Sequence, residues 1–142
     1  MSNHTPAQVA ALQAHLEFPI VSNQPEFSAV TLDPMRDGTL DQCMEFRITP
    51  MAWSPLAGGR LATGEGVRPE LLSILDGLAD REGVDRSQLA LAFVLAHPAA
   101  PVAIIGSQNA DRIRSSTAAL GITLDRSDVY AIVQASEGVP LP

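Results

Sequence analysis

Residues 102–109, Val-Ala-Ile-Ile-Gly-Ser-Gln-Asn, combine a short apolar run with a glycine turn and a helix cap. The apolar run is typical of a strand that is buried on both faces of a parallel sheet. Gly106 permits a tight turn, and Asn109 is a favourable N-cap for a helix that we expect to extend to about Leu120. A strand that leads directly into a helix is the building unit of an α/β fold.

Two earlier segments repeat this pattern. Short buried strands are expected at Ile20–Ser22 and Met51–Trp53, and polar residues follow them, Asn23 and Gln24 in the first case and Ser54 in the second. Strands that alternate with helices predict a parallel sheet. Because ligands bind at the carboxyl ends of parallel strands, these polar residues mark the expected functional edge of the sheet.

Helix signals lie between the expected strands. Thr5 is followed by Pro6 and then by Gln8, which predicts a capping box at the start of a helix, and Asp85 with Gln88 predicts a second box. In chain order, helices are expected at about 6–16, 37–46, 69–82, 86–96, 110–120 and 127–136, with an irregular glycine-rich loop at 56–68.

The composition indicates one ordinary globular domain. The chain has 142 residues, 46% of them hydrophobic, which is enough for one core, so residues 1–142 are assigned to a single domain. The net charge of −7 disfavours a nucleic acid or an anionic membrane as partner, because both attract clustered basic residues. No apolar run approaches the roughly 20 residues of a bilayer span, and no targeting segment is visible. The single cysteine, Cys43, fits a reducing compartment, and we expect a cytoplasmic protein.

All nine basic residues are arginine, so the chain offers no lysine for a Schiff base, a P-loop or acid catalysis. His4, His15 and His97 have no partners at metal-ligand spacing, and no metal site is expected. Cys43 has no flanking nucleophile motif and is interpreted as a core residue. Four charged residues near the end of the 69–82 helix are interpreted as a solvated face: Asp76, Asp80, Arg81 and Glu82.

The turn at Gly106–Asn109 is the first candidate site. Glycine allows a ligand to approach the backbone, and the helix that follows presents unpaired N–H groups to an anion. Arg112 lies one turn into that helix, where its guanidinium suits a phosphate. The alternative interpretation is a plain glycine turn with a solvated arginine.

The second candidate site is the segment Trp53–Arg60, which reads Trp-Ser-Pro-Leu-Ala-Gly-Gly-Arg. Pro55 fixes a sharp exit from the strand, and Gly58 and Gly59 would allow a phosphate to lie against backbone amides. The segment is not a hydrolase G-x-S-x-G elbow. A glycine-rich surface loop is the alternative, and for Trp53 a core position is favoured over one beside a ligand.

Both segments, in this order, resemble the aldo/keto reductase family, whose members carry a W-S-P-L-A-G-G loop after the seventh barrel strand and an I-I-G-S turn with a helical arginine after the eighth. Ser2-Asn3 resembles the end of the family's G-V-S-N motif after strand five. Residues 22–28 resemble the strand-six segment, and residues 87–92 resemble the helix before strand eight. The similarity covers nearly the whole chain, and residues 130–140 resemble the bacterial oxidoreductase subgroup.

The resemblance implies a (β/α)₈ TIM barrel that binds NADP(H) in extended form and transfers a hydride between the cofactor and a carbonyl. This chain would supply about the last three strands with their helices, as an incomplete α/β domain. The implied contacts to the nicotinamide are Ser2, Asn3 and Gln24; those to the pyrophosphate are Ser54, Pro55, Leu56, Ala57 and Gly58, with Trp53 beside them; and those to the adenosine 2′-phosphate end are Gly106, Ser107, Gln108, Asn109, Arg112 and Ser116.

The sequence departs from the family at two points. Ser115 and Ser116 occupy positions at which relatives typically have the Glu and Asn that contact adenine. The family's catalytic Asp, Tyr, Lys and His lie on strands one to four, ahead of the matched region, and the only tyrosine here is Tyr130 in the last expected helix. No catalytic residue is therefore expected in this chain, which would be inactive by itself.

Three functions are compatible with this pattern: the NADP(H)-binding C-terminal portion of an aldo/keto reductase, a nucleotide-binding module without turnover, and a truncated product without function. Unpaired sheet edges predict self-association or pairing with a complementing N-terminal barrel half. A small doubly wound sheet is the alternative fold. It is disfavoured because no G-x-G-x-x-G turn follows the first strand.

Overall fold

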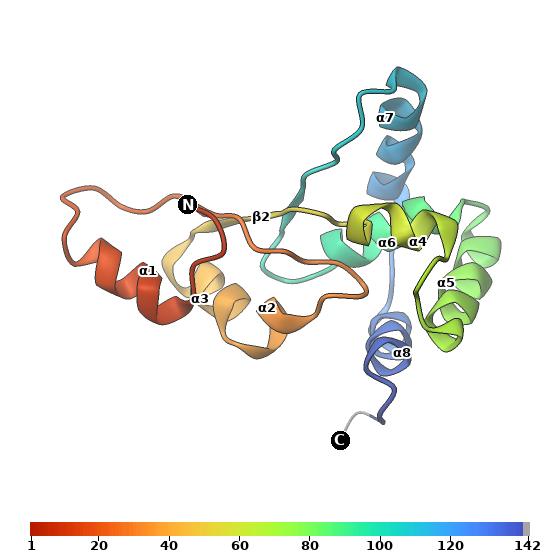
Figure 1. The fold of residues 1–142 in the computed structure, drawn as a ribbon, viewed down its shortest axis with the longest axis horizontal. Coiled ribbons are helices and arrows are strands. Elements are labelled where there is room, and N and C mark those ends of the chain that lie inside the picture. Colours follow the sequence, from red (N-terminus) through yellow and green to blue (C-terminus); the bar gives the residue numbers. More distant parts are fainter. Residues whose placement is uncertain (141–142) are drawn as a thin grey trace.

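Three short parallel strands run through the middle of the structure, a computed structural model that describes residues 1–140 (Figure 1). They are β1 (Ser22–Asn23), β2 (Thr49–Ala52) and β3 (Val102–Ala103), and their order in the sheet is β1-β2-β3. Each strand is separated from the next by helices. The α/β class and the three-stranded parallel sheet predicted from the sequence are confirmed.

The register brings the carboxyl ends of the strands together. Ser22 lies opposite Thr49, and Met51 lies opposite Val102. A parallel bridge between Ser2 and Gln24 continues the sheet beyond β1. The first strand begins later than the sequence predicts, and Val21 is exposed rather than buried, because no layer of the described structure covers it.

The helices and 3₁₀ segments are α1 (Pro6–Gln13), α2 (Asp33–Arg36), α3 (Thr39–Phe46), η1 (Ala57–Gly59), α4 (Arg60–Thr63), α5 (Pro69–Glu82), α6 (Arg86–Leu95), α7 (Ala110–Ser116), η2 (Thr117–Gly121) and α8 (Arg126–Glu137). Both predicted capping boxes are present, at the starts of α1 and α6. The loop predicted at 56–68 contains η1 and α4, which are too short to produce a periodic apolar pattern. The helix predicted at 110–120 changes to a 3₁₀ turn at Thr117.

The main core lies between the sheet, α5, α6 and α8. Six consecutive residues of α6, Leu89–Val94, are buried, so that this helix has no solvent-facing stripe over that length. One side of α6 packs in the main core, and the other side contacts Ala119 of η2. The remaining fully buried large side chains of the core are Phe27, Leu40, Leu61, Leu71, Leu75 and Ile132.

Two ion pairs join the helices around this core, and they use Arg81 and Asp76 of the solvated face predicted for α5, in which Asp80, Arg81 and Glu82 are exposed as predicted. Arg81 donates to both oxygens of Asp128 on α8, at 2.8 and 2.7 Å. Arg86 at the start of α6 donates to both oxygens of Asp76, at 2.5 and 2.7 Å. Each arginine lowers the pKa of its partner carboxyl below the ordinary value. The prediction of a solvated face did not include these partners, because Arg86 lies 10 positions from Asp76 and Asp128 lies 47 positions from Arg81.

Cys43 is buried in a small cluster with Val9 and Ile48, as predicted, and burial raises the pKa of its thiol. Within residues 1–140, no helix has the length and apolar character needed to cross a membrane. The same described residues contain no group of three His, Cys, Asp or Glu side chains placed to hold a metal ion.

Candidate functional site

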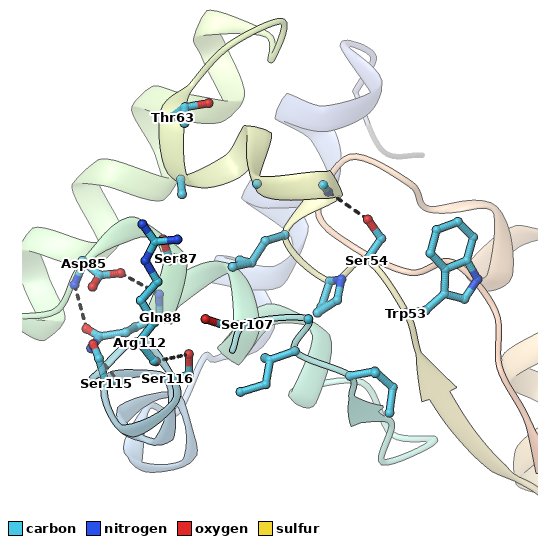
Figure 2. A pocket seen from close by; sticks show the side chains of 18 of the residues that line it. Trp53, Ser54, Thr63, Asp85, Ser87, Gln88, Ser107, Arg112, Ser115 and Ser116 are labelled. Carbon is cyan, nitrogen blue, oxygen red and sulfur yellow. Dashed lines mark hydrogen bonds between the residues drawn. The ribbon is translucent and has the colours of Figure 1, made fainter. Parts of the chain in front are cut away.

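A cavity of about 1050 Å³ opens beside the carboxyl ends of β2 and β3 (Figure 2). The loop after β2, the turn after β3 and the helices α4, α6 and α7 supply its walls. Its lining residues are Trp53, Ser54, Pro55, Leu56, Gly58, Gly59, Ala62, Thr63, Asp85, Ser87, Gln88, Ile104, Ile105, Gly106, Ser107, Asp111, Arg112, Ser115 and Ser116. Both segments singled out in the sequence therefore meet in one cavity at the expected edge of the sheet.

The loop after β2 turns sharply because several of its residues have left-handed backbone. Ser54 and Ala57 have φ of 51°, and Gly58 and Gly59 have φ of 68° and 94°. The Gly58 N–H donates to the Ser54 hydroxyl at 2.8 Å, which closes the turn. A Cβ atom on either glycine would meet nothing within 4 Å, so the backbone here is open to a ligand. Ala57 points instead into the core and is 4% exposed.

Trp53 lies at the edge of the cavity and not in the core, so the core position favoured from the sequence is wrong. Its indole Nε1 donates to Oδ1 of Asn3 at 2.8 Å. The Asn3 N–H and the Ser2 hydroxyl both donate to the Gln24 carbonyl, at 3.0 and 3.1 Å. Ser2, Asn3 and Gln24 thus form one group that is joined to the cavity through Trp53, although they do not line it.

The turn after β3 contributes Gly106 and Ser107 to the cavity wall. Asn109 does not line it, because its Oδ1 accepts from the N–H groups of Asp111 and Arg112, at 2.9 and 3.1 Å, and so caps α7 as predicted. Gln108 is exposed and also lies outside the lining. The turn therefore brings some of its residues to the cavity and uses the others to begin the helix.

Arg112 is the one basic side chain among the described residues that line the cavity. It makes no ion pair with any residue in the range 1–140, whereas Arg114, two positions later, pairs with Asp111 at 2.8 Å. The Asp85 carboxylate is occupied by the N–H of Gln88, at 2.9 Å. The guanidinium of Arg112 is thus available for an anion while the neighbouring carboxylates are already engaged.

Two helical segments, α4 and the start of α6, line the cavity although the sequence analysis did not place them there, and Ser115 joins Arg112 and Ser116 of α7. Thr63 comes from α4, Asp85, Ser87 and Gln88 from the start of α6, and Ser115 from α7. Figure 2 shows the α6 residues and Ser115 around Arg112. The capping pair of Asp85 and Gln88 predicts where α6 begins. That this helix start faces the cavity follows only from the tertiary packing.

The chemical character of the cavity suits a long ligand with anionic groups. Pro55, Leu56, Ile104 and Ile105 give apolar walls, two glycine-containing turns allow close backbone approach, and Arg112 supplies one positive charge. Trp53 lies at one end of this arrangement, and Ser115 at the other (Figure 2).

Parallel strands with a cavity at their carboxyl ends place the chain among the α/β folds, in which both barrels and open sheets bind ligands at this edge. The chain belongs to the aldo/keto reductase family, whose sequence profile matches residues 1–137. It is 43% identical to the 6-dehydroglucose reductase of Novosphingobium aromaticivorans over 143 residues, covering 100% of this chain and 47% of that protein. It is 38% identical to the oxidoreductase YdhF of Escherichia coli, covering 100% of this chain and 48% of YdhF.

A solved structure shows the same arrangement. A thermostable aldo-keto reductase, Tm1743, superposes with a TM-score of 0.84 at 25% identity, covering 94% of this chain and 46% of Tm1743. The chain thus spans about half the length of the relatives that it matches. The predicted family and the partial TIM barrel are confirmed, and the doubly wound alternative is not supported.

Proposed function

We propose that this chain forms the NADP(H)-binding part of an aldo/keto reductase, with the dinucleotide extended along the cavity. The observation that carries the proposal is the guanidinium of Arg112, which makes no ion pair within residues 1–140 and lines the same cavity as both glycine turns. An unpaired arginine beside a helix start suits a phosphate monoester such as the adenosine 2′-phosphate. Members of this family typically use a nicotinamide cofactor.

The cavity suggests how the parts of the cofactor would be divided. Trp53, with Ser2, Asn3 and Gln24 beyond it, would hold the nicotinamide end. The segment Ser54–Gly58 would hold the pyrophosphate, because its glycine backbone is open on that side. Gly106, Ser107, Arg112 and Ser116 would form the 2′-phosphate end, where the turn and α7 meet. Of the contacts implied by the family resemblance, Gln108 and Asn109 lie outside the cavity wall, so Asn109 would act there only by capping α7.

The chemical step would need groups that these 142 residues do not contain. The sequence has no lysine, and its one tyrosine, Tyr130, lies on α8, where its hydroxyl accepts from Arg126 at 2.9 Å. We therefore expect the 142 residues to bind NADPH without reducing a carbonyl by themselves. Since one relative is named a 6-dehydroglucose reductase, an oxidised sugar is the first substrate to test when the rest of a barrel is supplied.

The edges of the sheet suggest a partner for this step. An edge strand exposes backbone groups that another strand can pair with, and among residues 1–140 the outermost paired segments of the sheet are Ser2 on one side and β3 on the other. We expect these edges to drive self-association or to pair with a complementing set of barrel strands. Closure of the barrel would require strands at both edges.

The proposal is tested by measuring the dissociation constants of NADPH and NADH by calorimetry for the wild-type protein and for Arg112→Met. Loss of a charge-assisted phosphate contact should raise the dissociation constant of NADPH by about 10- to 100-fold and leave that of NADH nearly unchanged. Arg126→Met removes the same charge outside the cavity, on α8, and should change neither constant. Equal NADPH affinity in the wild type and in Arg112→Met would refute the proposed role.

A further inference from the structure

The helix that carries Arg112 is weakly anchored. None of the residues of α7 (Ala110–Ser116) is buried, and both Arg112 and Ser115 are exposed. In Figure 1, α7 extends away from the sheet and the main core. Such a helix has little hydrophobic packing to fix its direction, so its few polar contacts decide where Arg112 points.

Gln88 supplies those contacts. Its Nε2 donates to the backbone carbonyl of Ser115 at 3.0 Å and to the Ser115 hydroxyl at 2.8 Å. Apart from the local bond from the Thr117 hydroxyl of η2 to the Arg114 carbonyl, these are the only side-chain hydrogen bonds within residues 1–140 that join α7 to another helical segment. They meet α7 at its last turn, one turn along the helix from Arg112.

The other end of the same side chain is also fixed. Oε1 of Gln88 accepts from the N–H of Asp85 at 2.9 Å, as the second half of the capping box of α6. An amide that donates at one end and accepts at the other has only one orientation that satisfies both partners. Among the helices of residues 1–140, α6 has the most buried residues, so Gln88 connects α7 to a helix that the core holds in place.

We propose that Gln88 is a positioning residue, which holds α7 against the start of α6 so that Arg112 faces the cavity. This inference rests on the proposed function in one respect, namely that Arg112 binds the phosphate. If α7 is free to move, only a fraction of molecules have the arginine in place, and the apparent affinity falls by that fraction. Gln88 would thereby raise the preference for a 2′-phosphorylated dinucleotide without touching the phosphate.

The first test needs no cofactor. In a Ser115→Ala background, Gln88→Glu keeps the oxygen that accepts from Asp85 and removes the donor to the Ser115 carbonyl, and no serine hydroxyl remains to donate to the new carboxylate. The cap of α6 therefore survives while the link to α7 is broken. Amide hydrogen exchange in residues 110–116 should become about tenfold faster, with exchange in α6 unchanged. Gln8→Met, at the matching capping-box position of α1, is the control and should not alter α7. Unchanged exchange in α7 when Gln88→Glu is added to Ser115→Ala would overturn the proposal.

The second test is a double-mutant cycle on NADPH and NADH affinity. Gln88→Met, which adds no charge, should weaken the binding of NADPH by about three- to tenfold, and it should weaken that of NADH by less. It should have no further effect on NADPH binding in a protein that already carries Arg112→Met. An equal effect of Gln88→Met in both backgrounds would show that Gln88 does not act through Arg112. The wild type could bind neither dinucleotide while Gln88→Glu still speeds hydrogen exchange in α7. That result would support the role of Gln88 in holding α7 and would refute only the proposed function.

Discussion

The helices α6 and α7 both begin at the cavity and both have a side-chain cap, Asp85 for α6 and Asn109 for α7. Beyond that first turn the two helices differ in how far they are buried. Six consecutive residues of α6 are buried, from Leu89 to Val94, whereas none of α7 is. The comparison indicates that the two helices have different roles. The buried helix α6 is the scaffold, and the exposed helix α7, which we call the arm, carries the charged residue proposed to contact the ligand. Elements that contact ligands are commonly drawn from the less stable parts of a fold.

The largest expected effect separates the two helices by their contribution to stability. Leu89→Ala should lower the free energy of unfolding by about 3 kcal/mol, because Leu89 is fully buried and truncation leaves a cavity. Ile113→Ala should change it by less than about 0.5 kcal/mol, because that side chain is 40% exposed. Urea denaturation followed by circular dichroism measures both values. Similar losses for the two variants would contradict the division between scaffold and arm.

A smaller effect is expected on the pH dependence of the free energy of unfolding. Asp128 is 6% exposed, and its pairing with Arg81 lowers its pKa below the ordinary 3.8. A carboxyl with a lowered folded-state pKa stabilises the fold above its unfolded pKa, and this contribution is lost as the pH falls through the folded value. Asp128→Asn should therefore cost on the order of 1–2 kcal/mol at pH 7, and the difference from the wild type should shrink below about pH 3.8.

The same measurement has a matched control on α5. Asp80 lies beside Arg81 in sequence and forms no ion pair within the described residues, so Asp80→Asn should leave stability unchanged between pH 7 and pH 3. Residues 110–116 do not take part in the Arg81–Asp128 pair, and their hydrogen exchange should not follow the pH-dependent loss in Asp128→Asn. A cost for Asp128→Asn that persists undiminished at pH 3 would show that the ion pair is not its source.

Local signals in the sequence were sufficient for much of the fold. The capping boxes of Thr5 with Gln8 and of Asp85 with Gln88 lie within four residues, and both helices begin where these pairs predict. The apolar run that contains β3 likewise precedes its glycine turn as predicted. In each case, the residues that determine the structure are neighbours in the chain. The burial predicted for this last strand is wrong, because β3 covers only Val102–Ala103 and Val102 is 47% exposed.

The candidate site was only partly predictable from the sequence, because many of its contacts join residues that are not neighbours in the chain. The motif segments around Gly58 and Gly106 were identified, and they line one cavity. The sequence did not predict contacts between residues that are distant in the chain. Examples are the contact of Gln88 with Ser115, 27 positions apart, and that of Arg81 with Asp128, 47 positions apart. No local sequence pattern indicates which face of a helix contacts another element. For the same reason, the sequence does not show that Trp53 lies at the edge of the cavity instead of in the core.

The central claim, that this cavity binds NADP(H), is tested most directly by titrating the protein with NADPH while following the fluorescence of Trp53. Trp53 is the only tryptophan and lies at the edge of the cavity, so energy transfer to a reduced nicotinamide bound there would quench it. We expect saturable quenching at micromolar NADPH, reversed by an excess of NADP⁺. Unchanged Trp53 emission up to millimolar NADPH, in a protein shown to be folded by circular dichroism, would contradict it.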